Sequence, residues 1–189
     1  MSTQDLRVTK TKESLRAALM ELLTEKPLEK VAVTELCQRA GITRRTFYLH
    51  YESVAKLLEA IIEELLLQLE ASLRKTSQQR QHAQATHLQP QMISLFHHVA
   101  AHRQMYRYIF SASSQFSIYK RFYERIKTIV RQSLTDMEIK QEVREFYASY
   151  NANAVLGLIM EWSEQEFQQT ATTMASVLVE MMELENEEE

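Results

Sequence analysis

Apolar residues recur three and four positions apart along most of this 189-residue chain, and that spacing lines one face of an α-helix. A first helix is predicted over residues 9–24 and a longer one over residues 53–74. Five more are predicted at about residues 90–101, 104–110, 115–134, 139–163 and 169–183. The apolar stripes of the first two are Leu15, Ala18, Leu19, Leu22 and Leu23, and then Leu57, Leu58, Ile61, Ile62, Leu65, Leu66 and Leu69.

Two short helical patterns flank Gly41, one of only two glycines in the chain. The first covers Val33–Ala40, and Gly41 then permits a tight turn because a positive φ costs glycine nothing. Thr43 is the expected N-cap of a second short helix that runs to Leu49. A helix-turn-helix is therefore predicted over residues 31–50.

Turn-forming residues are scarce, with two glycines and two prolines in all, against roughly 12% expected from average usage. Sheets and irregular loops depend on them, so the chain is predicted to be all-α, with about nine helices. Residues 75–89 are rich in Gln and lack periodicity, and we interpret them as a linker. Residues 185–189 are expected to be frayed.

Charge is distributed unevenly, although the net charge is only −3. Residues 1–50 carry nine Lys and Arg against six Asp and Glu, a net of +3. Residues 136–189 carry two against thirteen, a net of −11. This asymmetry favours contact with a polyanion at the N-terminal end alone.

The chain shows no pattern of a secreted or membrane-spanning protein. Its single cysteine, Cys37, excludes an intramolecular disulfide and is expected to pack in the core. No apolar run is long enough to cross a bilayer, and the first ten residues are polar. A soluble, cytoplasmic protein with no membrane partner is expected.

The residues around the predicted turn resemble the TetR family of bacterial transcriptional regulators. They read Ala40-Gly41-Ile42-Thr43-Arg44-Arg45-Thr46-Phe47-Tyr48-Leu49-His50-Tyr51. The resemblance is strongest over residues 10–65, and the Tyr106-x-x-Ile109-Phe110 stretch and Trp162 resemble the C-terminal region of one subgroup. Two positions depart from the pattern, because Ala32 stands where a capping Thr is frequent and Val54 where a phosphate-contacting Lys is usual. Lys56 is the candidate to replace that lysine.

The resemblance implies a three-helix DNA-binding head over residues 1–52, within a family region of about residues 8–68. A helical regulatory and dimerisation domain would follow over residues 53–189. The implied function is that of a sequence-specific transcriptional regulator, a ligand-responsive repressor that binds a palindromic double-stranded DNA operator as a homodimer. The alternative is a TetR-like coactivator or protein-interaction module with little DNA binding of its own.

The resemblance also assigns the DNA contacts to the second short helix and its surroundings. Arg44 and Arg45 would reach base edges or phosphates, and an arginine bidentate to guanine contributes about 1–3 kcal/mol of discrimination. Tyr48 and His50 resemble the family's phosphate-binding pair. The predicted DNA-binding residues are Thr43, Arg44, Arg45, Thr46, Tyr48, His50 and Lys56. Phe47 and Tyr51 are assigned to the core.

The C-terminal part offers candidates for a dimer interface and for an effector pocket. The dimer candidates, at helical spacings on the last two helices, are Tyr150, Ala154, Leu158, Trp162, Met174, Val177, Leu178 and Met181. The pocket candidates are aromatic and methionine side chains: Phe96, Met105, Tyr106, Phe110, Phe122 and Tyr147. Ordinary core packing remains open for both sets, because a stripe at helical spacing does not distinguish core from binding surface.

No motif points to an enzyme, since the chain lacks a Gly-rich phosphate loop, a nucleophile elbow and a metalloprotease helix. We predict no catalytic residue and no cofactor. His98 and His102 are one helical turn apart and could hold a divalent metal if a third ligand converged. No Cys accompanies them, so we interpret them as solvated or capping histidines and predict no metal site.

Overall fold

The structure is a computed structural model that describes residues 3–78, 89–111, 114, 116–135 and 137–184. These ranges contain nine α-helices, one 3₁₀ turn and no strand, which confirms the all-α prediction. The chain divides into two compact units, Met1–Leu65 with Ser111–Ser114, and Leu66–Phe110 with Gln115–Glu189. No helix within the described ranges has the length and hydropathy needed to cross a membrane.

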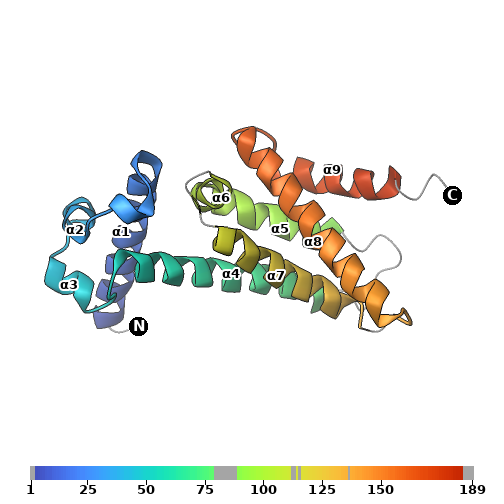
Figure 1. Cartoon of the computed structure of the whole chain (residues 1–189), viewed down its shortest axis with the longest axis horizontal. Helices are drawn as coiled ribbons and strands as arrows, with labels where there is room; N and C mark the ends of the chain where they lie inside the picture. Colours follow the sequence, from blue (N-terminus) through green and yellow to red (C-terminus); the bar gives the residue numbers. More distant parts are fainter. Residues whose placement is uncertain (1–2, 79–88, 112–113, 115, 136, 185–189) are drawn as a thin grey trace. The chain divides into compact units, whose positions relative to one another are not determined.

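The first unit is built from three helices and the start of a fourth, coloured blue to green in Figure 1. They are α1 (Thr3–Glu25), α2 (Val33–Ala40), α3 (Arg44–Tyr48) and the first part of α4 (Val54–Gln78), with a 3₁₀ turn, η1 (Leu28–Lys30), after α1. α1 packs against α2, and α2 packs against α3. The apolar stripes predicted for α1 and α4 are buried along their whole length, so both are confirmed as core.

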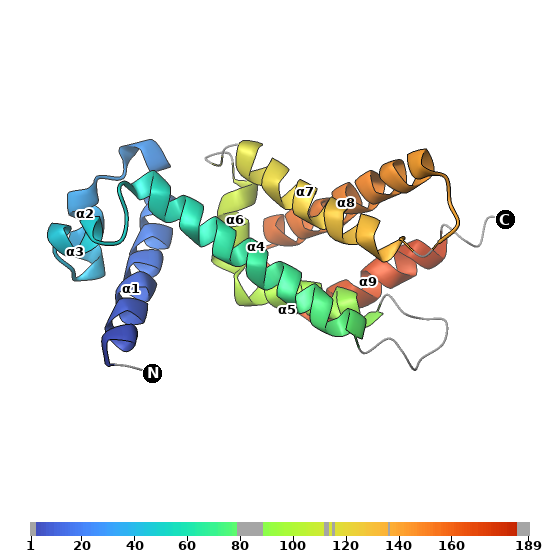
Figure 2. The same ribbon diagram turned by 90° about the horizontal axis from the view of Figure 1, so that it is seen from below.

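The second unit contains the rest of α4 and five further helices. These are α5 (Gln89–Ala101), α6 (Arg103–Phe110), α7 (Phe116–Ser133), α8 (Gln141–Glu164) and α9 (Ala171–Leu184). α5 packs against α9, and α8 packs against both α6 and α7 (Figure 1 and Figure 2). Its core is aromatic: the ring centroids of Phe96 and Trp162 lie 5.7 Å apart, and those of Tyr106 and Phe122 lie 5.6 Å apart. These contacts tie α5 to α8 and α6 to α7.

Several helix ends differ from the predicted ones. α1 begins at Thr3 rather than near residue 9, because no Gly or Pro interrupts the polar residues before its apolar stripe. α4 continues to Gln78 and α5 begins at Gln89, so both ends of the predicted linker are helical. Lys and Gln are good helix formers, which lets α4 continue past its last apolar residue. Residues 79–88 and 185–189 lie outside the described part of the chain.

The division between the units falls inside α4. We expected a boundary after residue 52, before this helix begins. The first unit instead extends to Leu65. The reason is burial, because Leu57, Leu58 and Ile61 are enclosed and α4 therefore supplies part of the first unit's core.

Candidate nucleic-acid interface

The turn between α2 and α3 is made by Gly41, which has φ 67° and ψ 30°. Its N–H donates to the carbonyl oxygen of Gln38 at 3.3 Å, and the N–H of Ile42 donates to that of Cys37 at 3.0 Å. A Cβ on Gly41 would meet no atom within 4 Å, so glycine is needed for the backbone conformation and not for space. The left-handed residue closes α2 and redirects the chain into α3.

Thr43 caps α3, as the sequence predicts. Its side-chain oxygen accepts a hydrogen bond from the Thr46 N–H at 3.1 Å, and the two threonine hydroxyls lie 2.8 Å apart. At the other end of this five-residue helix, Phe47 is fully buried, and its ring centroid lies 5.4 Å from that of Tyr48 and 6.1 Å from that of Tyr51. One buried ring thus anchors α3 and leaves its opposite face in solvent.

That outer face carries most of the predicted DNA-binding residues. Thr43, Arg44, Arg45 and Tyr48 are exposed, and Thr46 and His50 are half-buried. Leu49, to which the sequence analysis gave no role, joins them with 75% of its surface exposed. The sequence does not separate it from Phe47, two positions earlier, because α3 is too short for periodicity to show which of the two residues faces the core.

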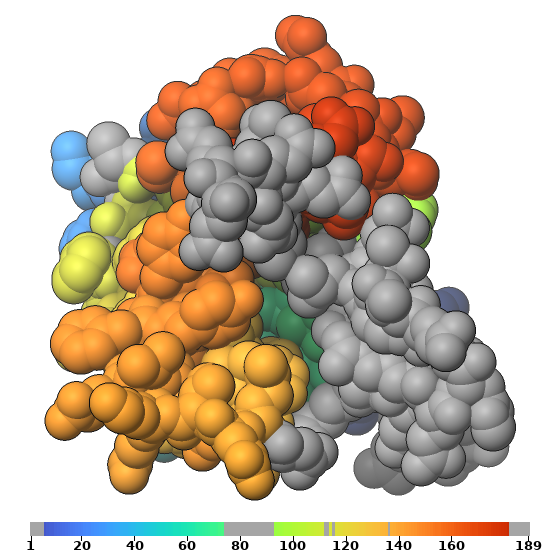
Figure 3. Space-filling view, turned by 90° about the vertical axis from the view of Figure 1, so that its right-hand side faces the viewer, coloured from blue at the N-terminus to red at the C-terminus, as the bar shows by residue number. Residues whose placement is uncertain are grey.

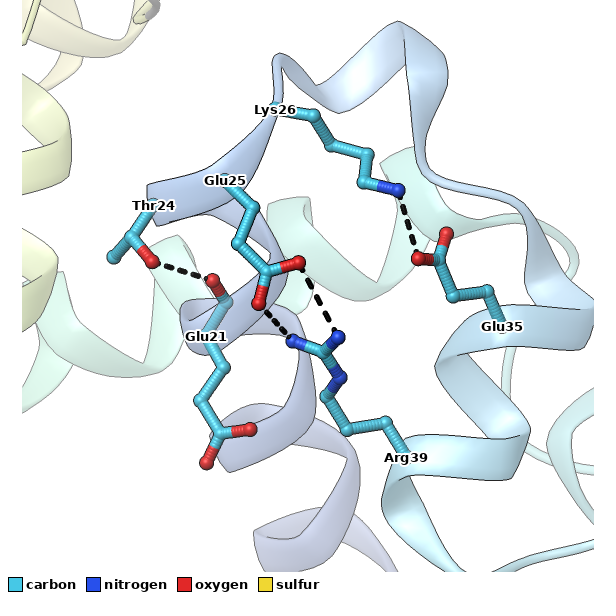
Figure 4. A network of polar contacts seen from close by, with 6 residues as sticks. All are labelled: Glu21, Thr24, Glu25, Lys26, Glu35 and Arg39. Atoms are coloured by element: carbon cyan, nitrogen blue, oxygen red, sulfur yellow. Dashed lines mark hydrogen bonds and ion pairs between the residues drawn. The ribbon is translucent and has the colours of Figure 1, made fainter.

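Several cations of the first unit are held in ion pairs, whereas among the described residues the two arginines on this face are not. Four cations form ion pairs, in which the nitrogen–oxygen distances run from 2.5 to 2.8 Å: Arg16 with Glu64, Lys26 with Glu35, Arg39 with Glu25, and Lys56 with Glu59. Figure 4 shows the second, from Lys26 just after α1 to α2, and the third, between α1 and α2. Within the described residues, neither Arg44 nor Arg45 forms an ion pair. The hydrogen bond from Arg39 lowers the pKa of Glu25, because it stabilises the charged carboxylate. Arg39 is therefore already paired with a carboxylate of its own chain.

Lys56, the candidate substitute for the family's lysine, lies in the first turn of α4. Its backbone N–H donates to the Ser53 hydroxyl at 3.2 Å, so Ser53 caps the helix. Its ammonium lies 2.8 Å from a Glu59 oxygen, and both side chains are exposed. An ion pair in solvent contributes only about 0–1 kcal/mol, so a phosphate can displace Glu59. Val54 is buried and packs with the core.

The predicted dimer residues fall into two groups. Tyr150, Ala154 and Met181 are exposed, and Leu158 and Val177 are half-buried. Trp162, Met174 and Leu178 are instead buried within their own unit. The Trp162 indole N–H donates to the carbonyl oxygen of Gln169 at 3.2 Å, so the one polar group of this buried side chain already has its hydrogen-bond partner. These three could meet a second copy only after the unit rearranged.

The predicted pocket residues divide in a similar way. Phe96, Met105, Tyr106 and Phe122 are buried in the second unit, and Phe110 is half-buried. Tyr147 is 44% exposed on α8, near Tyr150 and away from the buried aromatic cluster. It is therefore placed better for a protein interface than for lining an internal site.

His98 differs from the expected solvated or capping histidine. His98 is buried, with 8% of its surface exposed, and its ring centroid lies 4.7 Å from that of the half-buried His102. Burial, and then the neighbouring His102, lowers the pKa of His98 to about 4. Across the described ranges, no third His, Cys, Asp or Glu completes a metal-binding group with this pair. The spacing of the two histidines could be read from the sequence, whereas the burial of His98 could not.

A buried helical core with an exposed, cationic second helix defines a helix-turn-helix DNA-binding regulator. Sequence comparison supports this class: residues 15–61 match the description "Bacterial regulatory proteins, tetR family" and residues 86–184 match "Transcriptional regulator C-terminal region". The second match alone covers more than half of the chain. The chain therefore belongs to the TetR family, whose members regulate transcription and are not enzymes.

Individual relatives match this chain at lower identity or over a shorter stretch. The nucleoid occlusion factor SlmA of Marinobacter nauticus is 29% identical over 148 residues, which cover 70% of this chain and 71% of that protein. YvdT of Bacillus subtilis, an uncharacterized HTH-type transcriptional regulator, is 37% identical over 54 residues, which cover 29% of this chain and 28% of YvdT. The match thus spans less than a third of YvdT.

The fold also recurs among solved structures. NalD, the secondary repressor of the MexAB-OprM multidrug efflux pump in Pseudomonas aeruginosa, superposes with a TM-score of 0.71 at 17% sequence identity. The superposition covers 92% of this chain and 95% of NalD. This likeness concerns the fold of the whole chain.

Proposed function

We propose that this TetR-family protein is a homodimer that binds a palindromic DNA operator and represses transcription until a small effector binds. The observation that carries the DNA-binding role is the pair of unpaired arginines on the second helix of the helix-turn-helix. Arg44 and Arg45 on α3 are exposed without an ion-pair partner among the described residues, on the face that the buried Phe47 leaves in solvent. Such guanidinium groups are free to bind phosphates and guanine edges.

The operator contact would place α3 in the major groove, with its first turn toward the base edges. Arg44 and Arg45 then donate to guanine O6 and N7. Tyr48 and His50 donate to the flanking phosphates from their hydroxyl and imidazole N–H groups. Leu49 adds an apolar contact suited to a thymine methyl group, which would make it a specificity residue.

The dimer contact would use the outer face of α8. Apolar side chains at helical spacing are exposed there, and Val143, Phe146 and Tyr150 each have more than half of their surface in solvent. Part of this helix is visible in orange in Figure 3. Ala154 and Gly157 follow on the same face, and a Cβ added to Gly157 would meet no atom within 4 Å. Glycine inside a helix costs about 1 kcal/mol relative to alanine, and close approach by a second copy would explain its presence.

Selection of bound sequences from a random DNA pool tests the DNA-binding part. We expect a palindrome with half-sites one DNA turn, about 34 Å, or a multiple of it apart. Arg44, Arg45 and Lys56 from two protomers bring six cationic side chains to the DNA, so affinity should fall roughly a thousandfold between 50 and 200 mM salt if each displaces one counterion. If no sequence is enriched and binding hardly depends on salt, the protein-interaction alternative is correct instead.

Gly157→Leu tests the dimer. A bulky side chain at the crossing point would hold the two α8 helices apart, so we expect a monomer by light scattering at concentrations where the wild type is dimeric. Gly157→Ala is the milder variant: its single methyl group meets open space in the free unit, so the unit should stay folded and the dimer should weaken less than with leucine. A Gly157→Leu protein that stays dimeric would remove the α8 face from the interface.

The repressor part is proposed by analogy with NalD, a repressor with this fold, and activation is the alternative because the operon activator DhaS has the same fold. A reporter gene with the selected operator placed within its promoter tests this part directly. Expression should fall when the protein is produced, and it should not fall with a scrambled operator. Increased expression would mean that the protein is an activator.

A further inference from the structure

Four buried side-chain polar atoms in the described part of the second unit have no hydrogen-bond partner, and two of them are Nε2 of His98 on α5 and the hydroxyl of Tyr106 on α6. Their side chains are among the least exposed polar groups of the described chain, since His98 is 8% exposed and Tyr106 is 1% exposed. The two rings are in contact, with centroids 5.9 Å apart and planes at 89°. The two rings that carry these unpaired atoms thus come from two helices and pack directly against each other.

Unpaired buried polar atoms are rare because each carries the full cost of losing water. A protein that needed only a core at this place would use leucine and phenylalanine. The rest of the surroundings are indeed apolar, since the Tyr106 ring packs edge-on against the fully buried Phe122. Two unsatisfied groups side by side in an aromatic cluster indicate a partner that arrives from outside.

Both groups are neutral at physiological pH. Burial raises the pKa of the Tyr106 hydroxyl, and burial together with His102 holds the pKa of His98 at about 4. The phenol can donate or accept a hydrogen bond, and neutral imidazole Nε2 accepts one when its proton is on Nδ1. A charged ligand would lose its hydration here without meeting an opposite charge from either group.

We propose that His98 and Tyr106 bind a single oxygen atom of an uncharged, otherwise apolar effector. This inference rests on the proposed function, in which a small effector ends repression, and it places that effector in the second unit. A hydroxyl group satisfies both partners at once, because its oxygen accepts from Tyr106 while its proton is donated to His98. α6 packs on α8, so the ligand contacts the helix next to the one that carries the proposed dimer face. Binding can then shift the population between DNA-binding and released states.

The test compares three molecules of similar size: phenol, toluene and benzoate. Each is titrated into the full-length protein at neutral pH, and binding is followed by calorimetry or by amide shifts in NMR. Phenol should bind more tightly than toluene, because toluene lacks the oxygen, and more tightly than benzoate, because benzoate is charged. Equal affinities for the three, or no binding by any of them, would overturn the proposal.

Tyr106→Phe removes the hydroxyl and keeps the ring. Phenol affinity should fall about fivefold, toluene affinity should stay the same, and the melting temperature without ligand should be unchanged or higher. Tyr123→Phe is the matched control, because the Tyr123 hydroxyl is already hydrogen-bonded to the Ser149 hydroxyl and its loss should lower the melting temperature. If Tyr106→Phe lowers it as much, a water already satisfies this hydroxyl and the proposal is wrong.

Operator binding by the same preparations, measured without any probe, separates the two proposals. Loss of operator binding with the phenol preference intact would reject the regulator and keep the ligand site. Operator binding without a phenol preference would reject the ligand site and keep the regulator.

Discussion

The two units both leave polar side chains unpaired, but in opposite surroundings. In the first unit, Arg44 and Arg45 are exposed on α3 and form no ion pair within the described residues. In the second, His98 and Tyr106 are enclosed between α5 and α6 with one unsatisfied atom each. Water hydrogen-bonds to the exposed guanidinium groups of the arginines at all times. The two buried atoms of His98 and Tyr106 gain a hydrogen-bond partner only when a molecule enters the second unit.

This difference bears on stability and on function. An exposed cation changes the free energy of unfolding very little, so unpaired arginines on the DNA-binding face do not destabilise the fold. A buried unpaired group lowers stability until it is bound, which couples the state of the second unit to its ligand. The first arrangement suits a permanent binding surface, and the second suits a site that responds.

The largest effect is expected from the double substitution Arg44→Ala and Arg45→Ala. If both guanidinium groups contact guanine, operator binding should weaken by about 2–6 kcal/mol, since each contact contributes about 1–3 kcal/mol. The melting temperature should not change, because neither side chain is buried or ion-paired in the described structure. Fluorescence anisotropy and a thermal melt on one preparation measure both quantities.

Arg39→Ala is the control for the lost charge. Arg39 is held by Glu25 across α1 and α2, so its removal should lower stability slightly and leave operator affinity near the wild-type value. If Arg39→Ala weakens operator binding as much as the double substitution does, the effect reports overall charge. The distinction between paired and unpaired arginines would then fail.

The first unit could be predicted residue by residue because its signals are local. Gly41 in the turn, Thr43 at the cap and Phe47 in the core each follow from the conformation or spacing that its position requires. The same holds for the α4 stripe, which is wide enough to be buried whatever packs on it. Leu49 was missed because only the folded helix shows which of two neighbouring apolar residues is exposed.

The burial of residues in the second unit could not be predicted in this way, because the sequence is compatible with several ways of packing its helices. Trp162 and Tyr147 both stand on α8 in apolar surroundings, yet one is buried in the core and the other is exposed. Periodicity places residues on a face but does not say which face meets which helix. The burial of His98 depends on α6 folding over α5, a contact between elements that no local pattern records.

An intermediate effect is expected from pH. The folded protein keeps His98 neutral down to about pH 4, while an unfolded histidine binds a proton near pH 6.5. Stability should therefore be complete above about pH 6.5, decline as the pH falls, and level off below about pH 4, with a total loss from this residue of up to about 3 kcal/mol. Urea unfolding at several pH values measures it.

His98→Gln isolates that contribution, since glutamine keeps a polar end group and does not titrate. The difference in unfolding free energy between the wild type and His98→Gln should shrink as the pH falls from 7 to 4. The neighbouring Tyr106 does not ionise in this range, because burial raises its pKa. Parallel pH profiles for the two proteins would show that His98 is not buried without a partner.

A smaller loss is expected from Thr43→Ala at the start of α3. This removes the cap on the Thr46 N–H and the contact between the two hydroxyls, which should cost about 1 kcal/mol of stability. The measurement is urea unfolding. Because the freed N–H groups are exposed, water replaces the cap, and a loss above about 2 kcal/mol would mean that α3 begins in a buried environment.

The smallest effect is a gain, from Ala32→Thr. Ala32 is the N-cap of α2, its φ of −82° and ψ of 141° suit threonine, and it makes no side-chain cap. Glu35 stands three residues later, where a capping box would place it, but it is held by Lys26. The new hydroxyl should therefore add only about 0.5–1 kcal/mol of stability.

The same substitution at the exposed helix-interior residue Ala17 should instead cost a few tenths of a kcal/mol, roughly the difference in helix propensity. A gain well above this range at Ala32 would mean that water hydrogen-bonds poorly to the first N–H groups of α2. An exposed unpaired group would then destabilise the fold as much as the buried pair in the second unit does.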